Sequence, residues 1–234
     1  MVGALWFLRR AQAARLNRVA AIDLTLVVLI SGFVGGRLLH VFYEEPEYYL
    51  KHPLRVLAVW NGGFVFFGGM LAAIGGAYAF CFWRREPFLF WADRAALPSA
   101  LTYALGRIGC FFNGCCYGRR CEWPWAMVLE GIPRHPTQLY ASLWEFFTIG
   151  ILLLLEPRFK VSGVIFGLWL VMHGVGRIFM EFFRDDPRGL FIMGQSLGTW
   201  IGLGLVVMGF ALLLTLPAPW QYRRDPENGT DVAN

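Results

Sequence analysis

The sequence predicts an all-α fold, a polytopic bundle of transmembrane helices. Of its 234 residues, 57% are hydrophobic and only 16% are charged, whereas soluble domains are about 25% charged. The mean hydropathy is +0.50. The apolar residues also gather into six long segments with short connections, and each segment is long enough to cross a bilayer. This composition argues against a disordered chain and against a soluble enzyme.

The predicted spans follow one another along the chain. They run over residues 19–43, 61–83, 91–112, 138–155, 161–183 and 191–216. A shorter apolar segment, Met1–Leu8, precedes them and is too short to span alone, so we expect a truncated seventh span or a half-helix. Residues 1–218 are predicted to form one transmembrane domain, and residues 219–234 a polar, disordered tail.

Basic residues indicate how the spans are oriented. If six helices alternate, one set of connections and the tail hold Arg9, Arg10, Arg15, Arg18, Arg84, Arg85, Arg158, Lys160, Arg223 and Arg224. By the positive-inside rule, these loops and the C-terminal tail are expected to be cytoplasmic. The Cys-rich loop 113–137 is then expected on the periplasmic or extracellular side. The sequence pI of 9.1 reflects this topology, and we expect no nucleic-acid partner.

Several charged residues lie inside apolar segments or at their ends, where charge is costly, and six of them are candidates for a functional site. They are Arg37, Asp93, Arg107, Arg177, Glu181 and Arg184. Arg177 and Glu181 share one helix face, a spacing that also suits a structural ion pair or arginines that reach the interface. Arg37, Arg107 and Arg177 lie on three different segments with one nearby carboxylate, so positive charge is left over. This surplus favours an anionic partner, and a phospholipid phosphate is the commonest one in a membrane.

Paired glycines gather near the ends of the predicted spans. Gly62-Gly63 and Gly68-Gly69 flank residues 64–67 at an outer boundary. Glycine there permits broken backbone that lines a cavity, and close helix packing is the alternative. Gly68 and Gly69 are therefore candidate substrate-binding residues.

A resemblance to a known family rests on three segments. They are Gly-Arg-Ile-Gly-Cys-Phe-Phe-Asn-Gly-Cys-Cys-Tyr-Gly at 106–118, Arg-His-Pro-Thr-Gln-Leu-Tyr at 134–140 and Gly-Arg-Ile-Phe-Met-Glu-Phe-Phe-Arg at 176–184. Trp-Asn-Gly-Gly at 60–63, Gly68-Gly69 and Met-Gly-Gln at 193–195 fall in the matching order. Together they resemble the prolipoprotein diacylglyceryl transferase family over nearly the whole chain.

The resemblance implies a seven-span enzyme of the bacterial inner membrane. Such an enzyme moves the diacylglyceryl group of phosphatidylglycerol to the lipobox cysteine thiol of a preprolipoprotein, forming a thioether and releasing glycerol phosphate. We expect no cofactor and no metal ion. Positioned guanidinium groups stabilise charge on the leaving phosphate. The thiol, with a usual pKa of about 8.5, must lose its proton to attack.

The resemblance also implies roles for single residues. It aligns a phospholipid-contacting arginine with Arg107, and a second arginine and its nearby glutamate with Arg177 and Glu181. Glu181 would orient Arg177 or accept a proton, and His135 is the other candidate base. The candidate catalytic residues are Arg107, Arg177, Glu181 and His135. The candidate substrate-binding residues are Arg107, Asn113, Gly114, Arg37, Asp93, Gln138, Tyr140, Arg184, Gly68 and Gly69.

Four positions depart from the family pattern and leave other functions open. Phe67 stands where the family has a histidine, Cys110 where it has an asparagine, and Cys115 and Ala141 where it has glutamates. One alternative function is a membrane thiol oxidoreductase that uses the outer-loop cysteines. The other is a phospholipid-binding protein without catalysis.

Four cysteines lie within the outer loop or next to it. Cys110, Cys115, Cys116 and Cys121 do not follow a common zinc or iron–sulfur spacing. A disulfide is expected for them in an oxidising compartment, and Cys116–Cys121 is one possible pair.

Overall fold

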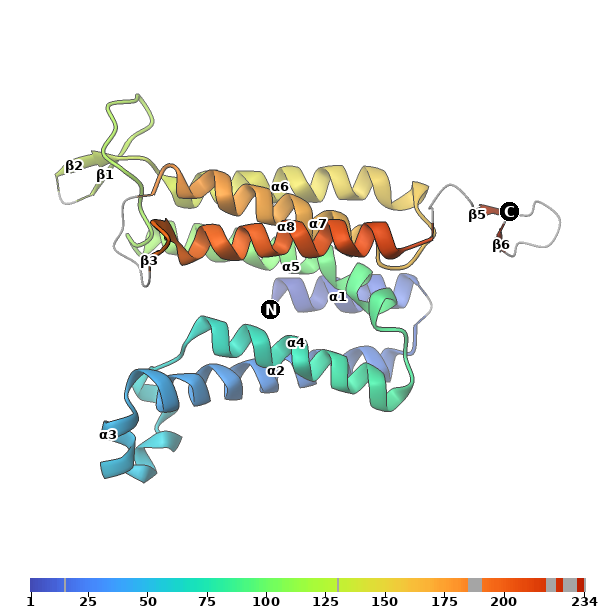
Figure 1. Cartoon of the computed structure of the whole chain (residues 1–234), viewed down its shortest axis with the longest axis horizontal. Coiled ribbons are helices and arrows are strands. Elements are labelled where there is room, and N and C mark those ends of the chain that lie inside the picture. The colour runs from blue at the N-terminus through green and yellow to red at the C-terminus, as the bar shows by residue number, and fades with distance from the viewer. Residues whose placement is uncertain (15, 130, 185–190, 218–221, 225–230, 234) are drawn as a thin grey trace. The chain divides into compact units, whose positions relative to one another are not determined.

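Helices dominate the computed structural model of the chain (Figure 1), which confirms the predicted all-α class. The structure describes residues 1–14, 16–129, 131–184, 191–217, 222–224 and 231–233. Its contacts divide the chain into two compact units, Ala4–Phe88 and a larger one that joins Met1–Gly3 to Leu89–Asn234. The smaller unit is built around one helix pair, and the larger one around a bundle of helices.

The helix pair of the Ala4–Phe88 unit is joined by an irregular segment. The elements in order are α1 (Val2–Ala13), α2 (Arg18–Leu39), a π-helical turn (His40–Glu44), α3 (Pro46–Lys51), 3₁₀ turns (Pro53–Leu57 and Val59–Asn61) and α4 (Phe66–Arg84). Asn17 caps α2, because its side chain accepts a hydrogen bond from Val19 N at 2.9 Å. All of the short apolar segment Met1–Leu8 except Met1 belongs to α1.

Glycines bring α2 and α4 into close contact. A Cβ on Gly68 would lie 2.5 Å from the carbonyl oxygen of Gly35, and one on Gly69 would lie 2.9 Å from that of Gly32. Small residues of this kind let two helix backbones approach each other. Gly68 and Gly69 therefore pack against α2, and substrate binding by them stays a prediction. The broken backbone expected in this region occurs at Gly62-Gly63, where φ is +79° and +78°.

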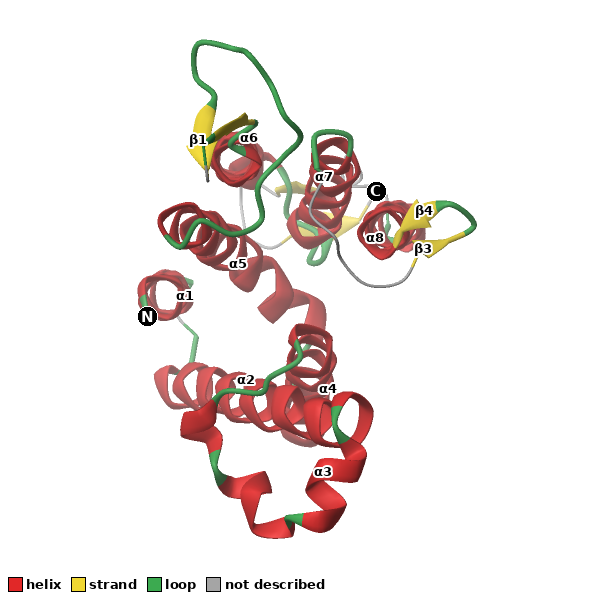
Figure 2. Ribbon diagram, turned by 90° about the vertical axis from the view of Figure 1, so that its left-hand side faces the viewer, coloured by secondary structure: helices red, strands yellow, loops and turns green. Residues whose placement is uncertain are grey.

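The larger unit is a helical bundle with short hairpins near the helix ends (Figure 2). Its elements in order are α5 (Phe88–Phe112), β1 (Met127–Leu129), β2 (Ile132–Arg134), α6 (Thr137–Leu155), α7 (Val164–Glu181), β3 (Phe191–Ile192), β4 (Gln195–Ser196) and α8 (Leu197–Thr215). Strand β1 pairs with β2, and β3 with β4, both antiparallel. Helices α7 and α8 approach closely, because a Cβ on Gly174 would lie 2.6 Å from the carbonyl oxygen of Gly202.

Helices α5 and α7 run in the same direction and are joined at both ends. At their starts, the Asp93 carboxylate accepts hydrogen bonds from the backbone N–H groups of Gly163 and Phe166 at 2.7 and 2.8 Å. Just beyond their ends, Gly118 and Arg184 form an antiparallel bridge. Asp93 and Gly163 are 70 residues apart in the sequence. Because two α-helices rise equally per residue, this register continues along both helices.

The predicted spans are supported in part. Each of the six predicted segments contains an α-helix. In the described part of the chain, four helical segments are long and apolar enough to cross a membrane, namely Arg18–Glu44, Thr137–Arg158, Val164–Glu181 and Leu197–Thr215. Membrane crossing by α4 and α5 stays a prediction.

One span boundary differs from the prediction. Residues 191–196 were expected to begin the last span, but the structure places them in the β3–β4 hairpin. The reason is local, since Met193 and Gly194 take left-handed conformations with φ of +51° and +76° and turn the chain. Within the predicted tail, β5 (Tyr222–Arg224) and β6 (Asp231–Ala233) pair as antiparallel strands. The rest of residues 218–234 lies outside the described residues, and the domain limit at residue 218 stays a prediction.

Candidate active site

Two arginines occupy equivalent positions on neighbouring parallel helices. The rings of Tyr103 on α5 and His173 on α7 meet edge to face, with centroids 4.7 Å apart. One helical turn further on, Arg107 follows Tyr103 and Arg177 follows His173. Because α5 and α7 run in the same direction, both arginines lie at the same level of the bundle. This level is one turn closer to the end where Gly118 and Arg184 meet.

Among the residues that the structure describes, neither guanidinium group is neutralised by a carboxylate. Arg107 is half-buried and lies over Tyr103, with its guanidinium carbon 4.7 Å from the ring centroid. Arg177 is also half-buried. Among the described residues, no Asp or Glu lies within ion-pair distance of either side chain. Two such cations in a bundle of low charge can bind an anion such as a phosphate group.

Glu181 is the acidic group of this region. It follows Arg177 by one turn of α7, and its Oε2 is buried with no hydrogen-bond partner in the described chain. Both side chains reach the start of α8, where the Cβ position of Gly198 would lie 2.8 Å from Arg177 Nη2 and 2.9 Å from Glu181 Oε2. The ion pair that their spacing would also allow is not formed. Glycine at position 198 leaves room for both polar groups.

A second buried carboxylate lies on α6 and was missed from the sequence. Glu145 is 1% exposed, and its Oε1 lies 2.5 Å from His173 Nδ1, a hydrogen bond between α6 and α7. Its Oε2 is buried and unpartnered among the described residues. His173 in turn contacts the ring of Tyr103, and Arg107 lies over that same ring, so a chain of contacts links Glu145 to Arg107. The available signal was that Glu145 is the one acidic residue in the predicted span 138–155.

The chain that follows α5 is fastened to the start of α6. Thr137 Oγ1 donates to the carbonyl oxygen of Cys116 at 2.8 Å, and Gln138 Nε2 donates to that of Cys115 at 2.5 Å. Gln138 is 1% exposed, and its Oε1 has no partner in the described part of the chain. Gly118 allows a close crossing here, because a Cβ would lie 2.5 Å from the carbonyl oxygen of Phe183.

Asn113 and Gly114 form the turn that ends α5. The backbone N–H of Asn113 donates to the carbonyl oxygen of Gly109 at 3.0 Å, while its side chain is exposed. Gly114 takes a left-handed conformation with φ of +64°. The Asn113 amide is therefore displayed beyond Arg107 at the same end of the helix.

His135, the candidate base, lies just before α6 and close to Tyr140. Its Nδ1 is 3.2 Å from Tyr140 Oη, which also accepts a hydrogen bond from Trp125 Nε1 at 2.8 Å. The rings of His135 and Tyr140 both contact Phe183, just after α7. The structure thus brings these two predicted site residues together near the C-terminal end of α7.

Asp93 and Arg184 have structural partners. Asp93 is 4% exposed and caps the start of α7 from α5, because each of its carboxylate oxygens accepts a backbone N–H. Arg184 is buried, and its carbonyl oxygen accepts a hydrogen bond from Arg119 Nε at 3.1 Å. The backbone contacts account for the Asp93 carboxylate without a lipid. Substrate binding by Asp93 or by Arg184 stays a prediction.

Arg37 is held by backbone carbonyl groups within the Ala4–Phe88 unit. Its buried guanidinium group donates hydrogen bonds of 2.6 to 3.0 Å to the carbonyl oxygens of Arg55, Val56, Gly62 and Gly63. A cavity of about 260 Å³ lies beside it, lined also by His40. The carbonyl groups explain the buried charge without a phosphate, so substrate binding by Arg37 stays a prediction.

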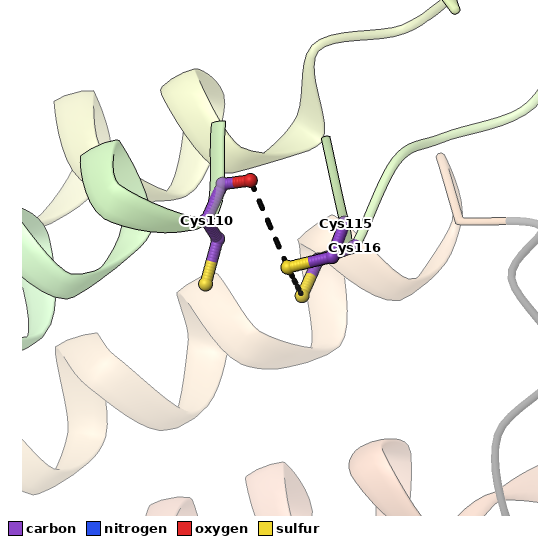
Figure 3. Close-up of side chains that lie close together, drawn as sticks. All are labelled: Cys110, Cys115 and Cys116. Atoms are coloured by element: carbon purple, nitrogen blue, oxygen red, sulfur yellow. Dashed lines mark hydrogen bonds between the residues drawn. The ribbon is translucent and has the colours of Figure 1, made fainter. Parts of the chain in front are cut away.

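The disulfide expected in the outer loop is not formed. None of the five cysteines, all of which are described, forms a disulfide in the structure. Cys121, the suggested partner of Cys116, is buried, and its backbone N–H donates to the carbonyl oxygen of Pro133. Cys116 gathers instead with Cys110 and Cys115 at the end of α5 (Figure 3).

A family model described as prolipoprotein diacylglyceryl transferase matches residues 1–215. The chain belongs to the prolipoprotein diacylglyceryl transferase family. This confirms the resemblance that the motifs at 106–118, 134–140 and 176–184 indicate.

Curated relatives from several bacteria cover most of the chain. One from Cupriavidus necator is 36% identical over 214 residues, which are 88% of this chain and 77% of the relative. One from Nitrosomonas europaea is 39% identical over 202 residues, 82% of this chain and 70% of the relative. One from Symbiobacterium thermophilum is 35% identical over 222 residues, which are 90% of this chain and 80% of the relative. All three are named phosphatidylglycerol–prolipoprotein diacylglyceryl transferase.

Three of the four unusual positions of this family member can be placed in the larger unit. Cys110 and Cys115 belong to the group of thiols at the end of α5. Ala141 is buried in α6, and Glu145 follows it by one turn on the same helix face. The buried carboxylate of α6 in this chain is therefore Glu145, in contact with His173.

Proposed function

We propose that this protein transfers the diacylglyceryl group of phosphatidylglycerol to the lipobox cysteine thiol of preprolipoproteins. Family membership over residues 1–215 supports the reaction class. The observation that carries the proposal is the pair Arg107 and Arg177, two half-buried guanidinium groups at one level of the bundle, with no carboxylate partner among the described residues. An anionic lipid headgroup is the partner that such a pair requires in a membrane.

Arg107 and Arg177 are proposed to bind the phosphate of phosphatidylglycerol. The reaction breaks the bond between the diacylglyceryl carbon and a phosphate oxygen, so negative charge develops on the leaving glycerol phosphate. Guanidinium groups that are already in place stabilise this charge bidentately, and low dielectric strengthens the interaction. Asn113 lies exposed beyond Arg107 and is proposed to contribute to binding of the headgroup.

The acceptor thiol attacks the same carbon and forms the thioether. Its proton must pass to a base before or during attack, because the thiolate is the nucleophile. Glu181 is proposed for this role, since its Oε2 is buried, unpartnered in the described chain and close to Arg177 through Gly198. His135 is the second candidate, and its Nδ1 is engaged near Tyr140 Oη.

The chain is proposed to lie in the bacterial inner membrane as a multi-pass protein. The basic loops and the C-terminus would be cytoplasmic, and the segment 113–137 would be periplasmic or extracellular. The Arg107 level then lies toward the outer end of the bundle. A lipobox cysteine presented from the outer leaflet side would reach this level without crossing the whole membrane.

Purified protein incubated with phosphatidylglycerol and a lipobox peptide tests the proposal by mass spectrometry of the peptide. The expected product carries one diacylglyceryl group on its cysteine. Arg107→Ala and Arg177→Ala should each lower the rate about 100-fold to 1000-fold, the range for losing one positioned charge-stabilising group. Arg158→Ala is the matched control, because Arg158 is exposed and donates a hydrogen bond to the carbonyl oxygen of Leu154, four residues earlier.

Each alternative function predicts a different outcome. Retained phospholipid without any peptide modification would favour a binding protein. A rate that survives both arginine substitutions would contradict the assigned site. Disulfide exchange without diacylglyceryl transfer would favour an oxidoreductase, although the three relatives above are all named as transferases.

A further inference from the structure

Three cysteine thiols come together where α5 ends (Figure 3). The Sγ atoms of Cys110, Cys115 and Cys116 all lie within 4.8 Å of one another, and all three residues are half-buried. We propose that this group, the thiol trio, binds one soft, thiophilic cation of the Cu(I) type through three thiolate ligands. The proposal stands independently of the transferase activity.

Backbone conformation holds the trio together. Cys110 lies in the last turn of α5, and the chain then folds back through two left-handed residues, Gly114 and Cys116, with φ of +64° and +65°. As a result, Cys115 Sγ donates to the carbonyl oxygen of Cys110 at 3.7 Å and lies 3.5 Å from Cys116 Sγ. A cysteine rarely adopts this conformation, so the surrounding structure must maintain it.

The start of α6 supplies that support. The side chains of Thr137 and Gln138 donate to the carbonyl oxygens of Cys116 and Cys115, and both α6 residues are buried. These hydrogen bonds fix the backbone of two of the three sulfur-bearing residues. A ligand set that is fixed by surrounding contacts in this way is preorganised for binding.

The spacing of the sulfur atoms suits a shared metal ion. With metal–sulfur bonds of about 2.3 Å, three ligands in a plane place their sulfur atoms about 4 Å apart. The observed limit of 4.8 Å is close to that value, so small rotations of the side chains would close the site. A disulfide would use two of the sulfur atoms and leave the third without a partner.

The donor set selects the kind of metal. Thiolates prefer soft ions such as Cu(I) and zinc, and structural zinc requires four ligands in a tetrahedron. Among the described residues, no fourth Cys, His, Asp or Glu belongs to the group. Three sulfur ligands therefore favour a three-coordinate Cu(I) ion. On binding, each thiol releases its proton to solvent.

A bound ion would also tie the end of α5 to the turn that follows it. Asn113 and Gly114 lie between the ligands Cys110 and Cys115 in the sequence. Their turn would become a closed loop anchored by the metal at both ends. The Cu(I) ion would thereby rigidify the region just beyond Arg107.

Anaerobic titration of the full-length, reduced protein in detergent tests the proposal. Cu(I) is added in competition with a chromophoric Cu(I) chelator, and wild type is expected to bind one equivalent per chain. X-ray absorption of that sample should show sulfur neighbours only. Cys81→Ser/Cys121→Ser is the matched control, because it removes two thiols outside the trio and should keep the full equivalent.

The triple variant Cys110→Ser/Cys115→Ser/Cys116→Ser should lose the bound equivalent. Should it fail to fold, the single variant Cys110→Ser decides the question, and its affinity should fall more than about tenfold. The proposal is overturned if the wild-type protein takes up no Cu(I). It is overturned as well if the folded triple variant, or Cys110→Ser, binds Cu(I) as tightly as wild type. It is also overturned if intact mass shows a disulfide within the trio in protein isolated from membranes. Because no readout involves lipid transfer, an inactive enzyme leaves this result unaffected.

Discussion

Gly198→Ala should lower the transfer rate while leaving the fold intact. In a helix, alanine is favoured over glycine by up to about 1 kcal/mol, so the substitution by itself stabilises α8. The new methyl group, however, would lie 2.8 Å from Arg177 Nη2 and 2.9 Å from Glu181 Oε2. Both atoms are the ends of flexible side chains, which can move aside at little cost. The change therefore acts on the position of the two groups rather than on stability.

The size of the effect follows from the displacement. Ordinary contact with a Cβ begins at 3.4 Å, so each polar atom must retreat by at least about half an ångström. A misplacement of about 1 Å in a catalytic site costs about 100-fold, which gives about tenfold for half that distance. This corresponds to about 1.4 kcal/mol of lost transition-state stabilisation. We expect the loss in kcat/KM with phosphatidylglycerol and a lipobox peptide.

Gly204→Ala is the matched control for this experiment. Gly204 lies in the same helix, and no heavy atom of the described residues lies within 4 Å of its Cβ position. It should gain the same helix propensity and keep the wild-type rate. Equal kcat/KM for the two variants, with both folded, would refute the placement of Arg177 and Glu181 in the reaction site.

Three further predictions concern the polar contacts of the bundle. Asp93→Ala should lower the free energy of unfolding by about 3 kcal/mol, because two backbone N–H groups at the start of α7 lose their acceptor. Asp93→Asn should lower it by less. Denaturant unfolding in detergent measures both variants. Arg37→Gln should speed proteolysis of residues 52–63 about tenfold, because the shorter amide side chain cannot replace the hydrogen bonds from the guanidinium group to the carbonyl groups of that segment. If the variant and wild type are cleaved at the same rate, Arg37 does not hold this segment in place. His173→Phe should lower the free energy of unfolding by about 3 kcal/mol, because it leaves the buried Glu145 carboxylate without its partner. In the same unfolding assay, His173→Gln should lose only about half as much.

The sequence predicted the helices well because their signal is local. Apolar segments near 138–155 and 161–183 became α6 and α7 with boundaries that agree within three residues. The hydropathy pattern placed the start of α8 too early, because it included residues 191–196 in the predicted span. In the structure, Met193 and Gly194 turn the chain within this segment. Left-handed conformation at a methionine leaves no trace in a hydropathy pattern.

The candidate site was predictable as a set of residues but not as a geometry. Charge in apolar segments identified Arg107, Arg177 and Glu181, and the family motifs gave the same residues. The pattern could not separate them from Asp93 and Arg37, because the partners of those two are backbone groups brought close by folding. Gly198 was missed for the same reason, since only the packing of α7 on α8 gives it a role.

The partners found for Asp93 and Arg37 make the remaining charges easier to interpret. With those two satisfied by backbone groups, Arg107, Arg177 and Glu181 carry a net charge of one positive unit, which the phosphodiester of phosphatidylglycerol would neutralise. In the proposed reaction the leaving glycerol phosphate gains a second negative charge. If Glu181 takes the thiol proton, it loses its own negative charge at the same time, so the site stays neutral throughout. Proton transfer to His135 would balance the charge equally well, so the preference for Glu181 rests on geometry, because its Oε2 meets Arg177 Nη2 at the Cβ position of Gly198.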